Sequence, residues 1–245
     1  MRKVLLIDSG SGGVNILKEC LKVCPCCDFL MFCDNKNLPY GSKTKEELIQ
    51  ITTQNLEFVR DFFPFEFIVF ACNTLTSTCI DFCREKFSDV EFVGTVPAIK
   101  PALEKFSEKE ILVIATEATI KHNKLISKHP NIKCLEMPDL ASLIDENLDN
   151  LDCLTPYLED KLLSYINGKK GEEKINALVL GCTHYAALKP ILEKILPEVE
   201  IFDGANGVAR RLGTLVGGES GDYQVRIMTS ENGDMWAKLW NYLNG

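Results

Sequence analysis

The sequence predicts an α/β fold of two similar lobes, each a mostly parallel sheet flanked by helices, with an active site in the cleft between them. Three observations support this prediction. Apolar runs alternate with helix-length amphipathic stretches along the 245 residues, a pattern typical of parallel sheets covered by helices. A faint internal repeat relates the two halves of the chain. Two cysteines also occupy equivalent places, each directly after an apolar run.

Eight apolar runs have the length and composition of buried strands. They are Lys3–Ile7, Phe29–Cys33, Phe67–Ala71, Glu91–Gly94, Ile111–Ala115, Ile132–Glu136, Ala177–Gly181 and Glu200–Phe202. The stretches that predict helices are Val14–Leu21, Lys45–Phe62, Thr76–Lys86, Pro97–Phe106, Asp139–Asn167, Tyr185–Ile195 and Met235–Leu243. We expect the charged stretch 139–167 to pack on the outside of the second half.

The internal repeat predicts where the lobes divide. The run Lys3–Asp8 resembles Glu110–Thr116, the segment at Cys72 resembles the segment at Cys182, and nearly equal lengths of chain separate the members of each pair. Two duplicated lobes are the simplest architecture that uses this repeat. We therefore assign residues 1–96 and 208–245 to the first lobe and residues 97–207 to the second.

Composition limits the classes of partner and the compartment. The formal net charge is −8, which argues against nucleic acid or an anionic membrane as the main partner. The first apolar run ends at Asp8, too early for a signal sequence, so we expect a cytoplasmic protein with reduced thiols. The Cys24-Pro-Cys-Cys27 spacing has no second ligand pair downstream, and we predict no metal site there.

Cys72 and Cys182 are the candidate reactive groups. Each lies at the carboxyl end of a predicted strand, where the following helix start favours a thiolate. Asn73-Thr74 and Thr183-His184 add polar groups directly after them. Either thiol alone could be an inert core residue, but their shared context favours a pair of acid/base or nucleophilic thiols facing one cleft.

Two loops supply further candidate site residues. Asp8-Ser9-Gly-Ser-Gly-Gly13 follows the first strand; it lacks the lysine of a P-loop and the third glycine of a dinucleotide fingerprint. Its glycines would allow close approach of a ligand, and Asp8 would point into the crevice. The second loop, Pro39–Lys43, offers backbone donors and the phenol of Tyr40, with Ser42 expected to cap the next helix.

In their order along the chain, these motifs resemble those of glutamate racemases, in the aspartate/glutamate racemase superfamily. The matching segments are Asp8–Gly13, Asp34, Pro39–Lys43, Ala71–Thr74, Gly94–Ala98, Ala115–Thr116, Leu180–Tyr185 and Asp203. The resemblance implies interconversion of L- and D-glutamate without a cofactor, to supply D-glutamate for peptidoglycan. It also implies that no metal takes part and that the protein is a homodimer.

The resemblance also implies roles for individual residues. Cys72 and Cys182 would exchange protons with the substrate, assisted by Asp8 and His184. The residues that would line the substrate site are Asp8, Ser9, Tyr40, Gly41, Asn73, Thr74, Thr183 and His184. The acidic position of the second lobe maps onto Asp145 or Glu146. An aspartate racemase, a hydantoin racemase, a maleate isomerase and a catalytically silent amino-acid-binding relative remain alternatives.

Overall fold

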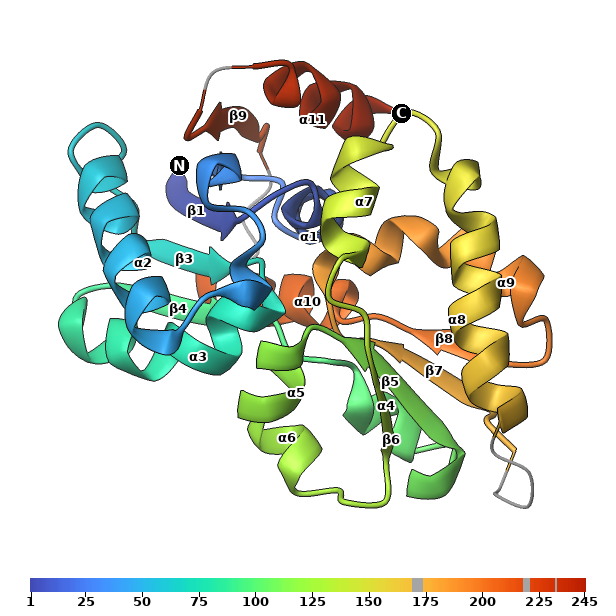
Figure 1. Cartoon of the computed structure of the whole chain (residues 1–245). Coiled ribbons are helices and arrows are strands. Elements are labelled where there is room, and N and C mark those ends of the chain that lie inside the picture. The colour runs from blue at the N-terminus through green and yellow to red at the C-terminus, as the bar shows by residue number, and fades with distance from the viewer. Residues whose placement is uncertain (169–173, 218–220, 232) are drawn as a thin grey trace.

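The computed structural model of the chain describes residues 1–168, 174–217, 221–231 and 233–245. Within these ranges the protein forms two parallel sheets flanked by helices, which confirms the predicted fold class (Figure 1). The strands are β1 Arg2–Asp8, β2 Cys27–Cys33, β3 Phe67–Phe70, β4 Glu91–Gly94, β5 Ile111–Ala115, β6 Lys133–Glu136, β7 Ala177–Leu180, β8 Glu200–Phe202 and β9 Gln224–Thr229. The helices are α1 Gly12–Val23, α2 Lys45–Arg60, α3 Asn73–Lys86, α4 Ile99–Leu103, α5 Glu117–His122, α6 Lys124–Ser127, α7 Leu140–Glu146, α8 Thr155–Gly168, α9 Lys189–Ile195, α10 Ala205–Val216 and α11 Met235–Asn244.

The two sheets repeat one topology. The first has the order β4-β3-β1-β2-β9, and the second has the order β6-β5-β7-β8. All strand pairs are parallel. Read from its other edge, the second sheet matches the first four strands of the first sheet, with β5 in the place of β1 and β7 in the place of β3. The internal repeat in the sequence therefore corresponds to a repeat in the structure.

Alternating side chains of each strand enter separate cores. In β1, Val4 and Leu6 pack with α1 and α10, whereas Leu5 and Ile7 pack with α2 and α3 on the opposite face. Both faces of the second sheet are covered in the same way, by α7, α8 and α9 on one side and by α4 and α6 on the other. Burial on both faces explains why the central strands are continuous apolar runs.

Strand β9 was not predicted from the sequence. It pairs with β2 at the edge of the first sheet, and of its six residues Ile227 alone is buried. An edge strand with one solvent-exposed face carries no long apolar run, so its sequence did not indicate a strand. The chain thus returns to the first sheet after the second is complete.

The prediction of one long helix over residues 139–167 was wrong. The segment forms α7, a short 3₁₀-helix at Leu151–Leu154 and then α8. Helix α7 ends at Glu146, and the turns that follow contain Asn147 and Asn150, residues that favour helix ends over helix interiors. Helix α7 is not on the outside either, because Asp145 is buried against the first half.

Two local predictions were also wrong. Ser42 lies inside a 3₁₀-helix at Tyr40–Ser42, and α2 is capped instead by Thr44, which forms a capping box with Glu47. The segment after Cys182 begins as a 3₁₀-helix at Thr183–Leu188 before α9 starts. None of the helices in the described ranges has the length and hydropathy needed to span a bilayer. The lobe boundaries at 96–97 and 207–208 stay a prediction.

Candidate active site

The two candidate cysteines occupy equivalent places in the two sheets. Cys72 follows β3 and precedes α3, and Cys182 follows β7 and precedes the 3₁₀-helix at Thr183–Leu188. Both have extended backbone conformations, with φ/ψ of −139°/124° and −141°/138°. Their exposed fractions are only 6% and 8%. The topological repeat therefore delivers one nearly buried thiol from each half of the chain.

The environment of Cys72 disfavours its thiolate in this state. Burial raises the pKa of Cys72 well above its ordinary value, and the negative charge of Asp8 adds to this effect. Hydrogen bonds from backbone N–H groups at the start of α3 oppose the increase but do not overcome it. The helix start thus favours the Cys72 thiolate as expected, but burial outweighs this contribution. Cys182 also raises the pKa of Cys72, so the two sulfur atoms lie within electrostatic range of each other.

Asp8 connects the two halves from the end of β1. Its carboxylate accepts hydrogen bonds from the N–H groups of Ser9 at 2.6 Å and Gly10 at 3.3 Å. It also accepts a hydrogen bond from the Thr183 hydroxyl at 2.9 Å, across the junction between the halves. Burial raises the pKa of Asp8 to about 6, although the charge of His184 and the Thr183 hydrogen bond act in the opposite direction. Asp8 can therefore change protonation state near neutral pH.

His184 stands between Cys182 and a buried acid. Its Nδ1 lies 3.7 Å from Cys182 Sγ, and its Nε2 lies 3.3 Å from Asp145 Oδ2. Burial alone would lower the pKa of His184, but the ion pair with Asp145 and the hydrogen bond with Cys182 raise it well above its ordinary value. Of the two acidic candidates, Asp145 is thus the one that contacts His184, and Glu146 is exposed.

The Ser9–Gly13 loop fits closely against this histidine and acid. The N–H of Ser11 donates to both carboxylate oxygens of Asp145, at 3.1 and 3.3 Å. A methyl group on Gly10 would overlap Asp145 Oδ2, and one on Gly12 would lie 2.5 Å from Thr183 Oγ1. Glycine is therefore required at both positions because the second half approaches the backbone of the first at contact distance.

The remaining candidate residues surround the same junction. The Tyr40 hydroxyl donates to Asp34 at 2.7 Å, and Gly41 lies against Thr116. The Thr74 hydroxyl lies 3.1 Å from that of Thr116, and the Asn73 amide donates to a backbone carbonyl at 3.5 Å. Ser9, Thr183 and His184 are buried beside Asp8. The structure thus brings all of the residues predicted from the sequence to one junction, with Tyr40 directed at Asp34.

Sequence reasoning gave no role at this junction to three residues, of which Asp34 was noted only as part of the family resemblance. Thr119 lies 3.1 Å from Thr116 and 3.4 Å from Thr74 through their hydroxyl oxygens. Asp34 accepts hydrogen bonds from three side chains, those of Asn37, Tyr40 and Asn55, and is fully buried. Asn15, on α1, donates to the backbone carbonyl of Thr183 at 2.9 Å. The place of Thr116 after β5, equivalent to that of Asp8 after β1, was the signal that could have led to Thr119.

The space beside Cys182 is small. A cavity of about 10 Å³ is lined by Cys182, Asn73, Thr95 and Asn15, among other residues. This volume suits about one water molecule and is far below that of an amino acid. The two halves are therefore closed on each other in this structure.

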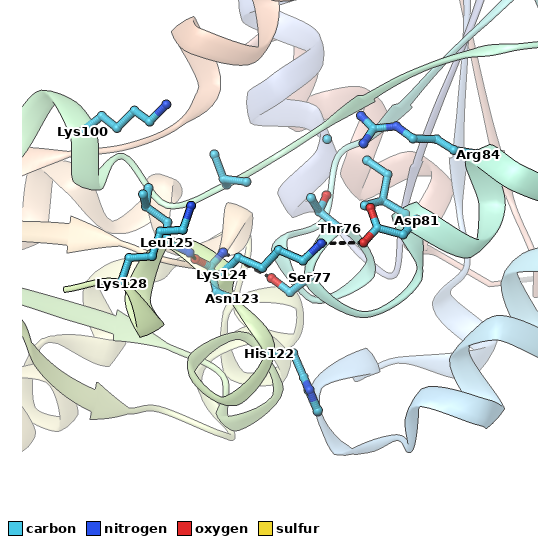
Figure 2. Close-up of a pocket in the computed structure, with 13 residues that line it drawn as sticks. Thr76, Ser77, Asp81, Arg84, Lys100, His122, Asn123, Lys124, Leu125 and Lys128 are labelled. Atoms are coloured by element: carbon cyan, nitrogen blue, oxygen red, sulfur yellow. Dashed lines mark hydrogen bonds and ion pairs between the residues drawn. The ribbon is translucent and has the colours of Figure 1, made fainter. Parts of the chain in front are cut away.

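A larger cavity of about 410 Å³ lies outside the cysteine site, between α3 of the first half and α4 and α6 of the second. Figure 2 shows its side chains, with Lys124 reaching across to Asp81 while His122 points away from the lysines. The ammonium of Lys124 lies 2.6 Å from Asp81, and Asn123 donates to Ser77 at 3.3 Å. Arg84, Lys100 and Lys128 add positive charge to the lining of this cleft. This cleft is therefore basic, in a protein with net charge −8.

Solved structures share this architecture over nearly the whole chain. Glutamate racemase from Escherichia coli, in complex with L-glutamate and the activator UDP-MurNAc-Ala, superposes with a TM-score of 0.83 at 28% identity, covering 99% of this chain and 94% of that one. Glutamate racemase from Francisella tularensis, in complex with D-glutamate, gives 0.80 at 26% identity, covering 100% and 94%. The fold and the thiol from each half define an amino-acid racemase, a class of isomerase.

Sequence relatives identify the family within this class. Glutamate racemases from Clostridium botulinum are 38% identical over 216 residues, covering 84% of this chain and 80% of the relative. The glutamate racemase of Clostridium novyi is 39% identical over 212 residues, with the same coverage. No protein-family model matches the sequence. The chain belongs to the glutamate racemase family.

Proposed function

We propose that the protein interconverts L- and D-glutamate by proton transfer between Cα of the substrate and two thiols, without a cofactor. The single observation that carries this proposal is the placement of Cys72 and Cys182 at equivalent strand ends of two repeated sheets, within electrostatic range of each other. Racemisation removes a proton from one face of Cα and delivers another to the opposite face. A thiol on each side of the substrate performs both steps.

The charges in the site suggest which thiol begins each direction. Asp8 and burial hold the proton on Cys72, which suits a donor. His184 Nδ1 lies 3.7 Å from Cys182 Sγ, where it can exchange a proton with this thiol. The resemblance to glutamate racemases implies that Cys182 faces the proton of L-glutamate, so Cys182 would take that proton while Cys72 delivers its own proton to the opposite face. The reverse reaction would begin with Cys72 as the thiolate, taking the proton of D-glutamate.

Hydrogen-bond donors around the junction would hold the substrate. Ser9, Asn73, Thr74 and Thr183 carry side-chain donors near the thiols, and Tyr40 and Gly41 close the same region. These groups would bind the two carboxylates and orient Cα between the sulfur atoms. The cavity of about 10 Å³ cannot hold glutamate, so we propose that the halves move apart to admit it and then exclude water.

Replacement of each cysteine tests the two-thiol function. Cys72→Ser and Cys182→Ser should each lower racemisation of glutamate by at least about a hundredfold, because serine is a far weaker acid than cysteine. Rates are followed by polarimetry, and deuterium uptake from solvent by mass spectrometry. Cys153→Ser, at an exposed position, is the matched control. Full racemisation by both site variants would reject the proposal.

A second candidate function is racemisation of aspartate or another amino acid, and a third is binding of an amino acid without turnover. A panel of L-amino acids analysed by chiral chromatography distinguishes these from glutamate racemisation.

We further propose that the protein is a cytoplasmic homodimer that supplies D-glutamate for peptidoglycan. Sedimentation equilibrium tests the dimer.

We also propose that the basic cleft binds an anionic effector. The E. coli relative was solved with the activator UDP-MurNAc-Ala, and the diphosphate of such a molecule would suit Lys100, Arg84 and Lys128. UDP-MurNAc-Ala should change the racemisation rate of the wild-type protein, and Lys128→Glu should reduce this change by about tenfold or more. Lys161→Glu, on α8 outside the cleft, should not. Equal responses of both variants and the wild-type protein would refute this assignment.

A further inference from the structure

A chain of hydrogen bonds runs from the C-terminal helix to the segment that carries Cys182. The Tyr242 hydroxyl, on α11, donates to Asn15 Oδ1 at 2.6 Å. Asn15 Nδ2, on α1, donates in turn to the backbone carbonyl of Thr183 at 2.9 Å. Thr183 directly follows Cys182, and its hydroxyl donates to Asp8 at 2.9 Å. Four separate elements therefore meet through one connected path.

The direction of this path is fixed by chemistry. A backbone carbonyl can only accept a hydrogen bond, so Asn15 must present its amide nitrogen to Thr183 and its oxygen to Tyr242. A tyrosine hydroxyl can donate to that oxygen, and phenylalanine cannot. Burial raises the pKa of Tyr242, which keeps the hydroxyl protonated and able to donate. The Thr183 carbonyl thus determines which end of the Asn15 amide faces the catalytic segment, and the Tyr242 hydroxyl holds the opposite end.

Packing holds Tyr242 at the junction of the two halves. Its ring contacts the core formed by β1, α1 and α10 and also the core formed by α7, α8 and α9. The ammonium of Lys18, one turn after Asn15 on α1, lies 4.6 Å from the centre of the ring. Figure 1 shows α11 extending from β9 towards α7, with the C-terminus beside α7. The hydroxyl therefore has little freedom to leave Asn15.

We infer that Tyr242 and Asn15 are positioning residues for Cys182: they hold the Thr183 backbone, and with it the thiol, in place when the two halves close. The inference rests on the proposed two-thiol function. It assigns the C-terminal helix a role mainly on one side of the reaction, because Thr183 directly follows Cys182, whereas Cys72 lies between β3 and α3 and is affected by this path through the charge of Asp8. The effect of losing the path should therefore depend on the hand of the substrate.

Elimination from 3-chloroglutamate measures each thiol separately. In this reaction one thiolate removes the Cα proton and chloride leaves Cβ with the bonding electron pair. The enamine product then hydrolyses to 2-oxoglutarate and ammonia, which are assayed. No second thiol is needed, and the equilibrium constant of racemisation places no constraint on the two rates. The enantiomer that reacts with Cys182 is identified as the one from which Cys182→Ser no longer eliminates chloride.

Tyr242→Phe should slow elimination from that enantiomer by about three- to tenfold, the effect of one lost hydrogen bond. The elimination rate of the other enantiomer should stay within about twofold of the wild-type rate. Asn15→Asp should slow the same hand more strongly, since a carboxylate would face the Thr183 carbonyl. Tyr223→Phe, the same chemical change at an exposed tyrosine, should leave both hands unchanged.

Other outcomes would overturn the inference. Unchanged rates for both hands in Tyr242→Phe would show that the path does not position the thiol. An equal decrease for both hands, accompanied by a lower Tm, would show a merely structural role. A wild-type protein that eliminates chloride from neither hand and racemises no glutamate would instead refute the two-thiol function, and the inference with it.

Discussion

Replacing Asp8 with asparagine should make the protein more stable and less active. The carboxyl group is fully buried at the end of β1, and burial raises its pKa from 3.8 to about 6. The folded protein therefore holds the proton of Asp8 more tightly than the unfolded chain does. Ionisation of this group at neutral pH consequently lowers the free energy of unfolding. Asparagine has nearly the same shape and carries no charge.

The pKa shift sets the size of the effect. At 1.36 kcal/mol for each pKa unit, ionised Asp8 lowers the free energy of unfolding by about 3 kcal/mol at pH 7.5. The stability of the neutral form is fully present below pH 3.8 and is lost as the pH rises through about 6. The same relation gives about 1.6 kcal/mol at pH 5 and about 0.5 kcal/mol at pH 4. Asparagine can keep both backbone N–H bonds on its oxygen, but its amide nitrogen then faces the Thr183 hydroxyl, so we expect a net gain of about 1–3 kcal/mol at pH 7.5.

Urea unfolding of Asp8→Asn and wild-type protein at pH 4, 5 and 7.5 measures this difference. Other titrating groups are shared by the two proteins and cancel. The control is Asp149→Asn, an exposed position where the change should stay within about 0.5 kcal/mol. Racemisation by Asp8→Asn should decrease at least about tenfold, because the variant lacks the charge that acts on Cys72. A stability gain that is the same at all three pH values would refute the reasoning.

Two further variants test the junction between the halves. Gly10→Ala should reduce racemisation and lower the free energy of unfolding by about 1–3 kcal/mol, since the new methyl group would overlap Asp145. Gly207→Ala, where a methyl group meets nothing within 4 Å, should be neutral or slightly stabilising in the same urea titrations; equal losses in both variants would contradict the close approach. Asp145→Asn should lower the pKa of His184, because burial then acts without the opposing charge, and NMR titration of the imidazole measures this. An unchanged His184 titration would show that another group sets its charge.

Several features of the fold could be predicted from the sequence because they are local. The eight apolar runs correspond to β1–β8 within a few residues at their ends. The internal repeat in the sequence corresponds to a repeated strand order in the two sheets. The placement of Cys72 and Cys182 after equivalent strands followed from the same pattern. Strand β9 could not be found in this way, because an exposed edge strand lacks the apolar run that indicates burial.

The protonation of the site needed the folded structure. A helix start after Cys72 suggested a favoured thiolate, but the pKa of Cys72 is raised by burial, which depends on everything packed around it. The choice between Asp145 and Glu146 depended on the break in the predicted long helix and on which face of α7 meets Ser11.

The sequence by itself determined the two sheets, their repetition and the presence of one cysteine at the end of a central strand in each. Periodicity and chain order encode these features within short segments. Only the tertiary structure decided the contacts around those cysteines: Asp8 with Thr183, Asp145 with His184, and Tyr242 with Asn15. Each of these contacts joins residues that are far apart in sequence, so no local pattern indicates it. Asp8 meets Thr183 where the two halves pack together, and the other two pairs form where distant segments of one half come together.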